Sequence, residues 1–309
     1  MNQPPLIEQV TQTMAAGSKS FATAAKLFDP ATRRSTLMLY AWCRHCDDVI
    51  DGQTLGEGGT QHQVADAQLR MQHLQIETRR AYSGAHMDEL AFRAFQEVAL
   101  THELPPQLAF DHLEGFAMDA REEHYITFED TLRYCYHVAG VVGLMMARVM
   151  GVRDENVLDH ACDLGLAFQL TNIARDIVED AQNGRCYLPE SWLTEAGLRA
   201  DQLADPHYRA AIAPLAARLV AAAEPYYHSA RSGLPDLPLR SAWAIATAHG
   251  VYREIGVKVQ DAGMRAWDAR QRTSKGEKLA LLLKGAGIAL TSRVARPQPR
   301  PAGLWQRPR

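Results

Sequence analysis

The amino-acid sequence predicts an all-α fold. Apolar residues recur at helical spacing along most of the chain, and alternating β-branched runs of the kind that form strands are few. With 309 residues, 47% of them hydrophobic and 22% charged, the chain can bury a sizeable core, which excludes global disorder. Helices are expected at residues 5–16, 30–52, 60–83, 87–101, 105–121, 128–150, 154–181, 189–195, 206–231, 238–263 and 275–290.

Glycine and proline separate these segments. Asp29 before Pro30 is typical of a helix start, because the aspartate side chain can cap the first turn and proline fits its first position. We see no internal repeat of fixed period. The other breaks between helices fall at residues 56–59, 105–106, 151, 184 and 233–238.

The sequence indicates a cytoplasmic protein without a membrane-spanning helix. It has no run of about 18 uncharged apolar residues, and its first residues are polar, with Pro4 and Pro5, rather than a signal peptide. Cys43 and Cys46 have the spacing of a zinc or redox motif, but no second pair completes such a site, so we expect them in a packed helix. An odd number of cysteines favours a reducing compartment. The cysteines are Cys43, Cys46, Cys135, Cys162 and Cys186.

Basic residues concentrate at the C-terminal end. From Lys258 to Arg309 there are twelve Lys or Arg and three acids, so this stretch carries +9 and the rest −12, for a total of −3. We expect residues 1–290 to form one domain and residues 291–309 to form a basic tail rich in proline and arginine. This composition is more typical of a solvated tail than of a binding segment, and the alternative is a peripheral contact with a lipid surface. No nucleic-acid partner is expected.

A first acidic cluster lies in the expected helix 30–52. Asp47 and Asp51 are four residues apart and so share one helix face, which Tyr40 and Arg44 also occupy. Like charges at this spacing weaken a helix, so the pair calls for a counter-cation. One interpretation is that the carboxylates hold Mg²⁺ on a diphosphate while Arg44 binds phosphate oxygens. The alternative is a solvated, salt-bridged face in which Arg44 compensates Asp47 and Asp48.

A second cluster lies in the expected helix 154–181. Two amides and two acids share one stripe of that helix, and apolar residues surround the stripe, so a purely solvated face is disfavoured. A metal ion or phosphate would satisfy these polar groups, and hard oxygen ligands suit Mg²⁺ better than Zn²⁺. The stripe consists of Gln169, Asn172, Asp176 and Asp180.

Three further segments carry weaker signals. The apolar stretch 134–146 is rich in small residues, which favours close helix packing over a substrate tunnel, and within it His137 is expected to be a core residue. Ser18-Lys19-Ser20 offers hydroxyls and an ammonium for phosphate, or simply a turn. Arg185 and Tyr187 follow the second acidic helix, where they either close over anions or end a loop.

Together these motifs resemble the squalene and phytoene synthase family, from about Ser18 to about Arg265. The resemblance implies one isoprenoid-synthase domain of the class I terpenoid synthase type, a helical bundle around a deep central cavity. Three motifs carry it, and their order and spacing are specific. They are Tyr40 with Arg44 and Asp47 to Asp51; Tyr134-Cys135-x-x-Val138-Ala139-Gly140-Val141-Val142-Gly143; and Leu164-Gly165 through Gln169, Asn172, Arg175, Asp176 and Asp180 to Arg185-x-Tyr187-x-Pro189.

The resemblance also assigns roles to individual residues. It places metal binding at Asp47, Asp51, Asn172 and Asp176, with Asp180 as a helper. It places prenyl diphosphate contacts at Ser18, Lys19, Ser20, Tyr40, Arg44, Gln169, Arg175 and Tyr252, to which we add Arg185 and Tyr187. Tyr134 matches a tyrosine close to the reacting cation, and the expected catalytic residues are therefore Asp47, Asp51, Tyr134, Asp176 and Asp180.

The implied activity is prenyl transfer. Two geranylgeranyl diphosphates would condense head to head, through a cyclopropylcarbinyl diphosphate, to phytoene, the first committed step of carotenoid biosynthesis. About two to three Mg²⁺ or Mn²⁺ ions would assist, and no NADPH is expected. The general base is Tyr134 or the released diphosphate. Two rivals remain: a squalene or dehydrosqualene synthase using C15 farnesyl diphosphate, and a non-catalytic relative that binds lipid surfaces.

Overall fold

The computed structural model describes residues 24–50, 60–295 and 298–309, and every regular element in these ranges is helical, as predicted. The helix expected at 5–16 lies outside the described residues. None of the described helices combines the length and apolarity needed to cross a bilayer. The chain divides into two compact units: the described parts of Met1–Glu123 with Leu144–Arg153, and His124–Gly143 with Asp154–Arg309.

The first unit is built around α3. Asp29 caps this helix by accepting hydrogen bonds from the backbone N–H groups of Ala31 and Thr32, each at 3.1 Å, which confirms the predicted start. Inside the unit, the fully buried Trp42 stacks on Phe95 with 4.1 Å between ring centroids. The helices are α3 (Pro30–Ile50), α4 (Thr60–Tyr82), α5 (Leu90–Thr101), α6 (Pro106–Ala120) and the later part of α8 (Val141–Val149).

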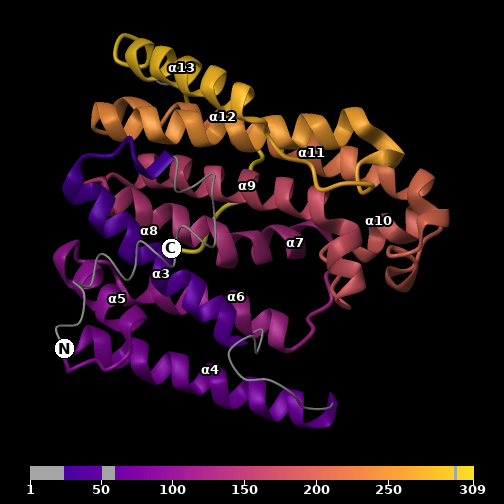
Figure 1. The fold of residues 1–309 in the computed structure, drawn as a ribbon, viewed down its shortest axis with the longest axis horizontal. Helices are drawn as coiled ribbons and strands as arrows, with labels where there is room; N and C mark the ends of the chain where they lie inside the picture. The colour runs from indigo at the N-terminus through magenta and orange to yellow at the C-terminus, as the bar shows by residue number, and fades with distance from the viewer. Residues whose placement is uncertain (1–23, 51–59, 296–297) are drawn as a thin grey trace. The chain divides into compact units, whose positions relative to one another are not determined.

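The second unit is organised on α9, which packs against α11 and α12 (Figure 1) and also against the turn η1. Asp154 caps α9 through the N–H groups of Asn156 and Val157. The helices are α7 (Phe128–Cys135), α9 (Glu155–Gln182), α10 (Glu190–Glu195), α11 (Arg209–Arg231), α12 (Leu239–Ala262) and α13 (Lys275–Thr291). Short turns are η1 (Tyr136–Gly140), η2 (Ala200–Gln202), η3 (Pro206–Tyr208), η4 (Leu234–Asp236) and η5 (Gly263–Arg265).

The helix expected at 128–150 is interrupted by a π-helical turn, η1, between α7 and α8. The small residues of this stretch allow close packing on α9, which is the interpretation that the sequence favoured over a substrate tunnel. A Cβ atom on Gly165 would lie 2.3 Å from the carbonyl oxygen of Ala139, and one on Gly143 would lie 2.4 Å from that of Ala161. Glycine is therefore required on both sides of this helix crossing.

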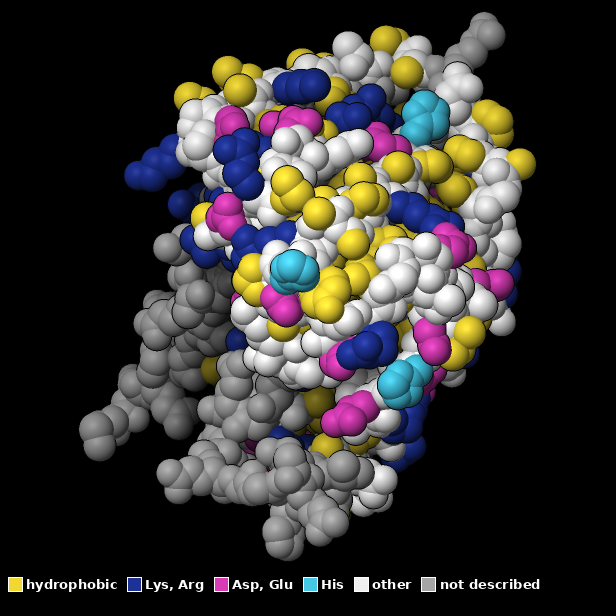
Figure 2. Space-filling view, turned by 90° about the vertical axis from the view of Figure 1, so that its right-hand side faces the viewer, with side chains coloured by type: hydrophobic (Ala, Val, Ile, Leu, Met, Phe, Trp, Pro, Cys, Tyr) yellow, Lys and Arg dark blue, Asp and Glu magenta, His cyan; other side chains and the backbone are white. Residues whose placement is uncertain are grey.

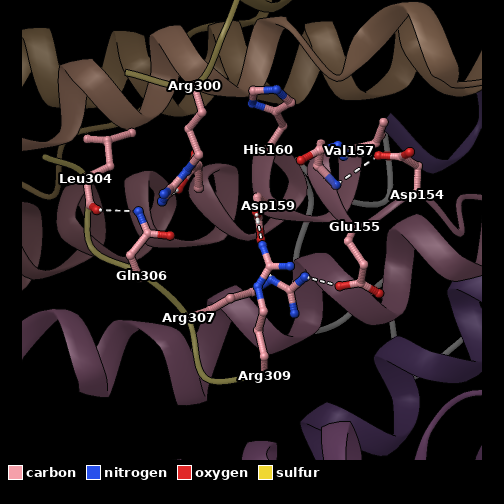
Figure 3. A network of polar contacts seen from close by, with 12 residues as sticks. Asp154, Glu155, Val157, Asp159, His160, Arg300, Leu304, Gln306, Arg307 and Arg309 are labelled. Atoms are coloured by element: carbon pink, nitrogen blue, oxygen red, sulfur yellow. Dashed lines mark hydrogen bonds and ion pairs between the residues drawn. The ribbon is translucent and has the colours of Figure 1, made fainter. Parts of the chain in front are cut away.

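The C-terminal segment 298–309 lies along α9, and the interpretation of a solvated tail is wrong for it. Figure 3 shows Arg307 beside Asp159 and Glu155, with which it forms ion pairs. Arg309 also binds Asp159, at 2.9 Å. Glu155 and Asp159 lie four residues apart on α9. Because these acids are distant in sequence, the tail alone does not reveal its partners.

A fully buried carboxylate anchors the same segment. Asp163 accepts two hydrogen bonds from Arg300, at 2.7 and 2.8 Å, and a third from the hydroxyl of Ser229 at 2.5 Å. Further along, the backbone N–H of Trp305 donates to the hydroxyl of Tyr226, and the Trp305 ring lies 5.4 Å from that of Tyr136 in η1. The last residues of the chain are thus part of the packed second unit.

Candidate active site

In the first unit, α3 presents Arg44 and Asp47 on one half-buried stripe, as their spacing predicts. The guanidinium of Arg44 donates to Asp47 at 2.9 Å and pairs with Asp48 at 2.6 Å. Tyr40, one turn earlier, is also half-buried. The protein alone therefore shows the salt-bridged arrangement, and metal binding at this face stays a prediction.

Several predicted residues lie outside the described ranges. These residues are Ser18, Lys19, Ser20 and Asp51.

The thiols of α3 are packed in the first unit. Cys46 is fully buried, and burial raises the pKa of Cys43 to about 12. A protonated thiol is a poor nucleophile and metal ligand, which fits the expected packing role.

In the second unit, α9 carries the other polar stripe, and Asp176 is its most heavily engaged member. Arg175 donates to both carboxylate oxygens of Asp176, at 2.8 and 2.5 Å, and only 14% of each side chain is exposed. Burial alone would lower the pKa of Arg175, but the hydrogen bonds with Asp176 and the nearby negative charges of Asp176 and Glu179 together raise that pKa above its usual value. The guanidinium of Arg175 therefore stays protonated.

Sequence reasoning missed Arg270, which joins the stripe from the loop before α13. Its guanidinium donates to Asp176 at 3.0 Å and to Glu179 at 2.8 Å. In the sequence, Arg270 stood out only as one of the basic residues of the C-terminal stretch. No local pattern could show that a residue 94 positions further on reaches Asp176.

Asn172 provides a test of whether a metal ion fits this stripe. Its amide nitrogen donates to Gln169 at 3.3 Å, while its oxygen, Oδ1, is buried and accepts no hydrogen bond from any described residue. A buried oxygen without a donor is costly, and a hard cation would satisfy it. The set of amide and carboxylate oxygens on this face has the chemistry that Mg²⁺ prefers.

The stripe does not form a metal centre by itself. Among the described residues, no three His, Cys, Asp or Glu side chains gather in the way a complete protein site would need. Asp180 is half-buried one turn after Asp176, and its carbonyl accepts the N–H of Arg185 at 2.9 Å. Ligands beyond the protein would have to complete the coordination, as substrate phosphates commonly do for Mg²⁺.

An aromatic cluster joins the end of α7 to the segment before α7 and the loop after α9. The ring of Tyr134 stacks on that of Tyr187 at 4.5 Å, and Tyr125 lies 5.4 Å from Tyr134. Thr131 fixes the loop after α9 by donating to the carbonyl of Tyr187 at 3.0 Å. The structure thus brings together two residues that sequence analysis selected separately.

A second aromatic pair lies between α9 and α12. Tyr252 stacks on Phe168 at 4.1 Å, and burial raises the pKa of its hydroxyl, so the group stays neutral. The positive charge of Arg175 opposes this rise in pKa, which indicates that the hydroxyl and the guanidinium are neighbours. Tyr252 therefore lies next to Arg175 of the polar stripe, and its contact with a prenyl diphosphate stays a prediction.

Comparison with known proteins agrees with the motifs. A model of the family described as Squalene/phytoene synthase matches residues 14–277. Over 308 residues, and the full length of both chains, the sequence is 65% identical to "Phytoene synthase" of Pseudescherichia vulneris and 64% identical to "15-cis-phytoene synthase" of Pantoea ananas. A "15-cis-phytoene synthase" of Paracoccus sp. is 50% identical over 98% of each chain.

Solved structures share the fold. A dehydrosqualene synthase in complex with a ligand superposes with a TM-score of 0.82 at 27% identity, covering 93% of this chain and 97% of the other. A squalene synthase from Alicyclobacillus acidocaldarius gives a TM-score of 0.66 at 21% identity over 94% and 93% of the two chains. The predicted class I terpenoid synthase fold is confirmed.

Proposed function

Since the chain belongs to the squalene/phytoene synthase family, we propose that it is the prenyltransferase that condenses two geranylgeranyl diphosphates to phytoene, the first committed step of carotenoid biosynthesis. The observation that carries this choice is the identity of 64–65% to phytoene synthases along the whole chain. The polar stripe of α9 supports it, because its acids and amides can hold a divalent metal ion while the neighbouring arginines bind phosphate oxygens.

The α9 stripe binds one diphosphate leaving group. Arg175 and Arg270 already lie beside Asp176, so their guanidinium groups can donate to phosphate oxygens while the carboxylate turns to a metal ion. The residues that would hold the metal here are Asn172, Asp176 and Asp180. On α3, Asp47 and Asp51 would do the same, with Arg44 and Tyr40 as phosphate contacts.

Bound Mg²⁺ or Mn²⁺ neutralises charge on the diphosphate and so makes it a better leaving group. The protein groups hold the departing diphosphate in place, which is electrostatic stabilisation of the developing charge. About two to three ions would serve this purpose. In this proposal Ser18, Lys19 and Ser20 are further donors to a prenyl diphosphate.

The aromatic residues stabilise the carbocation. The stacked rings of Tyr134 and Tyr187 present π faces to a passing allylic cation, and apolar walls exclude water that would quench it. The double bond of the second prenyl chain attacks the cation, and loss of a proton gives the cyclopropylcarbinyl diphosphate. The diphosphate of this intermediate then leaves, and the resulting cation rearranges and loses a second proton to give the C40 product. Tyr134 or the released diphosphate accepts these protons.

The rival is condensation of the C15 diphosphate to squalene or dehydrosqualene. Product identification after incubation with C15 or C20 diphosphate and Mg²⁺, with and without NADPH, separates the two. We expect phytoene from the C20 substrate without reductant. A C30 product formed in preference to phytoene would contradict the proposal.

A cytoplasmic location with a peripheral membrane contact completes the proposal. All five cysteines are free thiols, which supports a reducing setting. The arginines at 300, 307 and 309 are held by α9, so the tail is a poor candidate for a lipid contact. Another surface of the basic C-terminal region must supply it.

A further inference from the structure

Helix α13 turns apolar side chains outward. Leu279, Leu283 and Leu290 are 59%, 65% and 60% exposed, and Val294, just after the helix, is 88% exposed. Spacings of four and seven residues place the three leucines within roughly 40° of one another around the helix axis. They form one continuous stripe, which we call the outer face of α13.

The opposite side of α13 is fixed on α12, so the helix cannot rotate to bury this stripe. A Cβ atom on Gly285 would lie 2.5 Å from the hydroxyl oxygen of Thr247, and the indole N–H of Trp243 donates to the carbonyl of Leu282 at 2.8 Å. Figure 1 shows α13 lying along α12. A helix at a protein surface normally presents polar residues outward, and a row of exposed leucines marks an interaction surface.

The charges next to the outer face are basic. Residues 272–295 contain five Lys or Arg and a single acid, Glu277, which Lys258 already holds at 2.7 Å. Lys275 and Lys284 are exposed, and neither forms an ion pair within the described part of the chain. By contrast, acids and bases are interspersed over the face seen in Figure 2.

We propose that the outer face of α13 docks on the surface of an anionic lipid bilayer. Leucines on one face of a helix enter the boundary between headgroups and acyl chains, and flanking lysines extend to the lipid phosphates. The attraction of a basic segment to an anionic leaflet adds to the apolar contribution. This inference rests on the peripheral membrane contact proposed above and names its surface, but it does not depend on the reaction.

A second copy of the chain fits the outer face less well. A two-fold dimer through this face would bring the basic residues of one α13 segment near those of the other, and Glu277 is already engaged. Like charges would then meet without compensation. Lipid phosphates supply the negative charge that a second copy lacks.

The test is sedimentation of the full chain with vesicles of phosphatidylcholine, with and without phosphatidylserine. The test variant carries Leu279→Gln, Leu283→Gln and Leu290→Gln. Its matched control carries Leu69→Gln, Ile76→Gln and Leu100→Gln, which replace apolar side chains exposed to a similar extent elsewhere. We expect binding to serine-containing vesicles to fall about tenfold or more in the test variant and to stay unchanged in the control.

A second variant tests the charge contribution. Lys275→Gln with Lys284→Gln should remove most of the preference for phosphatidylserine while circular dichroism and the melting temperature stay as in the wild type. Wild-type protein that fails to sediment with anionic vesicles would overturn the proposal. So would equal binding by the leucine variant, or a wild-type dimer that this variant dissociates. Activity on detergent-dispersed substrate should not change, which separates docking from catalysis.

Discussion

The guanidinium of Arg270 lies 3.0 Å from Asp176 Oδ2, although the two residues are 94 positions apart. Arg175 binds the same carboxylate from the neighbouring position of α9. Two cations thus compensate the acid that is expected to bind metal in the complex with substrate. When the carboxylate turns to a metal ion, both guanidinium groups become available for phosphate oxygens.

Arg270→Gln should therefore raise the KM for the prenyl diphosphate by about tenfold, because a charged hydrogen bond to phosphate is lost. Stability should change little, since the ion pair is 40% exposed on the arginine side. Arg253→Gln is the matched control: Arg253 is 44% exposed and pairs with Glu224 elsewhere in the same unit. Steady-state kinetics measure the KM of each variant. An unchanged KM for Arg270→Gln would show that this arginine does not bind the diphosphate.

The contact of Gly165 with Ala139 predicts a large steric effect. In Gly165→Ala the new methyl group would meet backbone at 2.3 Å, so the crossing of α9 and η1 must open at a cost of about 2 kcal/mol. Gly287→Ala, inside α13 with nothing within 4 Å of its Cβ position, should instead stabilise the helix by about 0.5–1 kcal/mol. Urea denaturation measures both changes. A neutral Gly165→Ala would mean that the two segments are not in close contact.

Because the C-terminal segment is packed on α9, two of its arginines should contribute very differently to the free energy of unfolding. Arg300→Ala leaves the fully buried Asp163 carboxylate without its charged partner, which should cost about 3–5 kcal/mol of unfolding free energy. Arg309→Ala removes an ion pair whose arginine is 60% exposed and should cost less than about 1 kcal/mol. Similar small losses in both variants would show that the segment is not docked in solution.

His249 predicts how stability depends on pH. Burial lowers its pKa to about 4, and the ring donates to the carbonyl of Tyr227 at 2.9 Å. An unfolded histidine has a pKa near 6.5, so between about pH 6.5 and 4 the unfolded state binds the extra proton and stability falls as pH falls. From pH 7 to 5 the loss should be about 2 kcal/mol.

The variant His249→Gln keeps a donor for that carbonyl but cannot titrate. Denaturation at pH 7 and pH 5 should show a smaller loss for this variant than for the wild type. An identical pH dependence in the two proteins would exclude His249 as the source.

Local signals allowed most helices to be predicted within a few residues. Asp29 and Pro30 define the start of α3, and Ser274 with Glu277 forms the capping box that begins α13. The stripe on α9 follows from helix geometry alone, because residues three and four apart share a face. These features depend on neighbours in sequence and are therefore visible in it.

The remaining features depend on contacts between distant segments. The π-helical turn η1 arises where Gly165 meets Ala139, and nothing within 128–150 marks the position of the extra residue. Arg270 reaches Asp176 from a distant loop. The many basic residues of the C-terminal segment indicated solvent exposure. The acids that bind Arg300 and Arg307 lie on α9, far away in the sequence, so the segment itself does not reveal them.

The central claim is that the acidic residues of α3 and the polar stripe of α9 each bind a divalent metal ion together with diphosphate. The most direct test is Mn²⁺ binding, followed by electron paramagnetic resonance in the presence of diphosphate, for wild type, Asp47→Asn, Asp176→Asn and the double variant. We expect that each single change weakens Mn²⁺ binding about tenfold or more and that the double variant binds Mn²⁺ most weakly. Mn²⁺ binding that neither change alters would contradict the account.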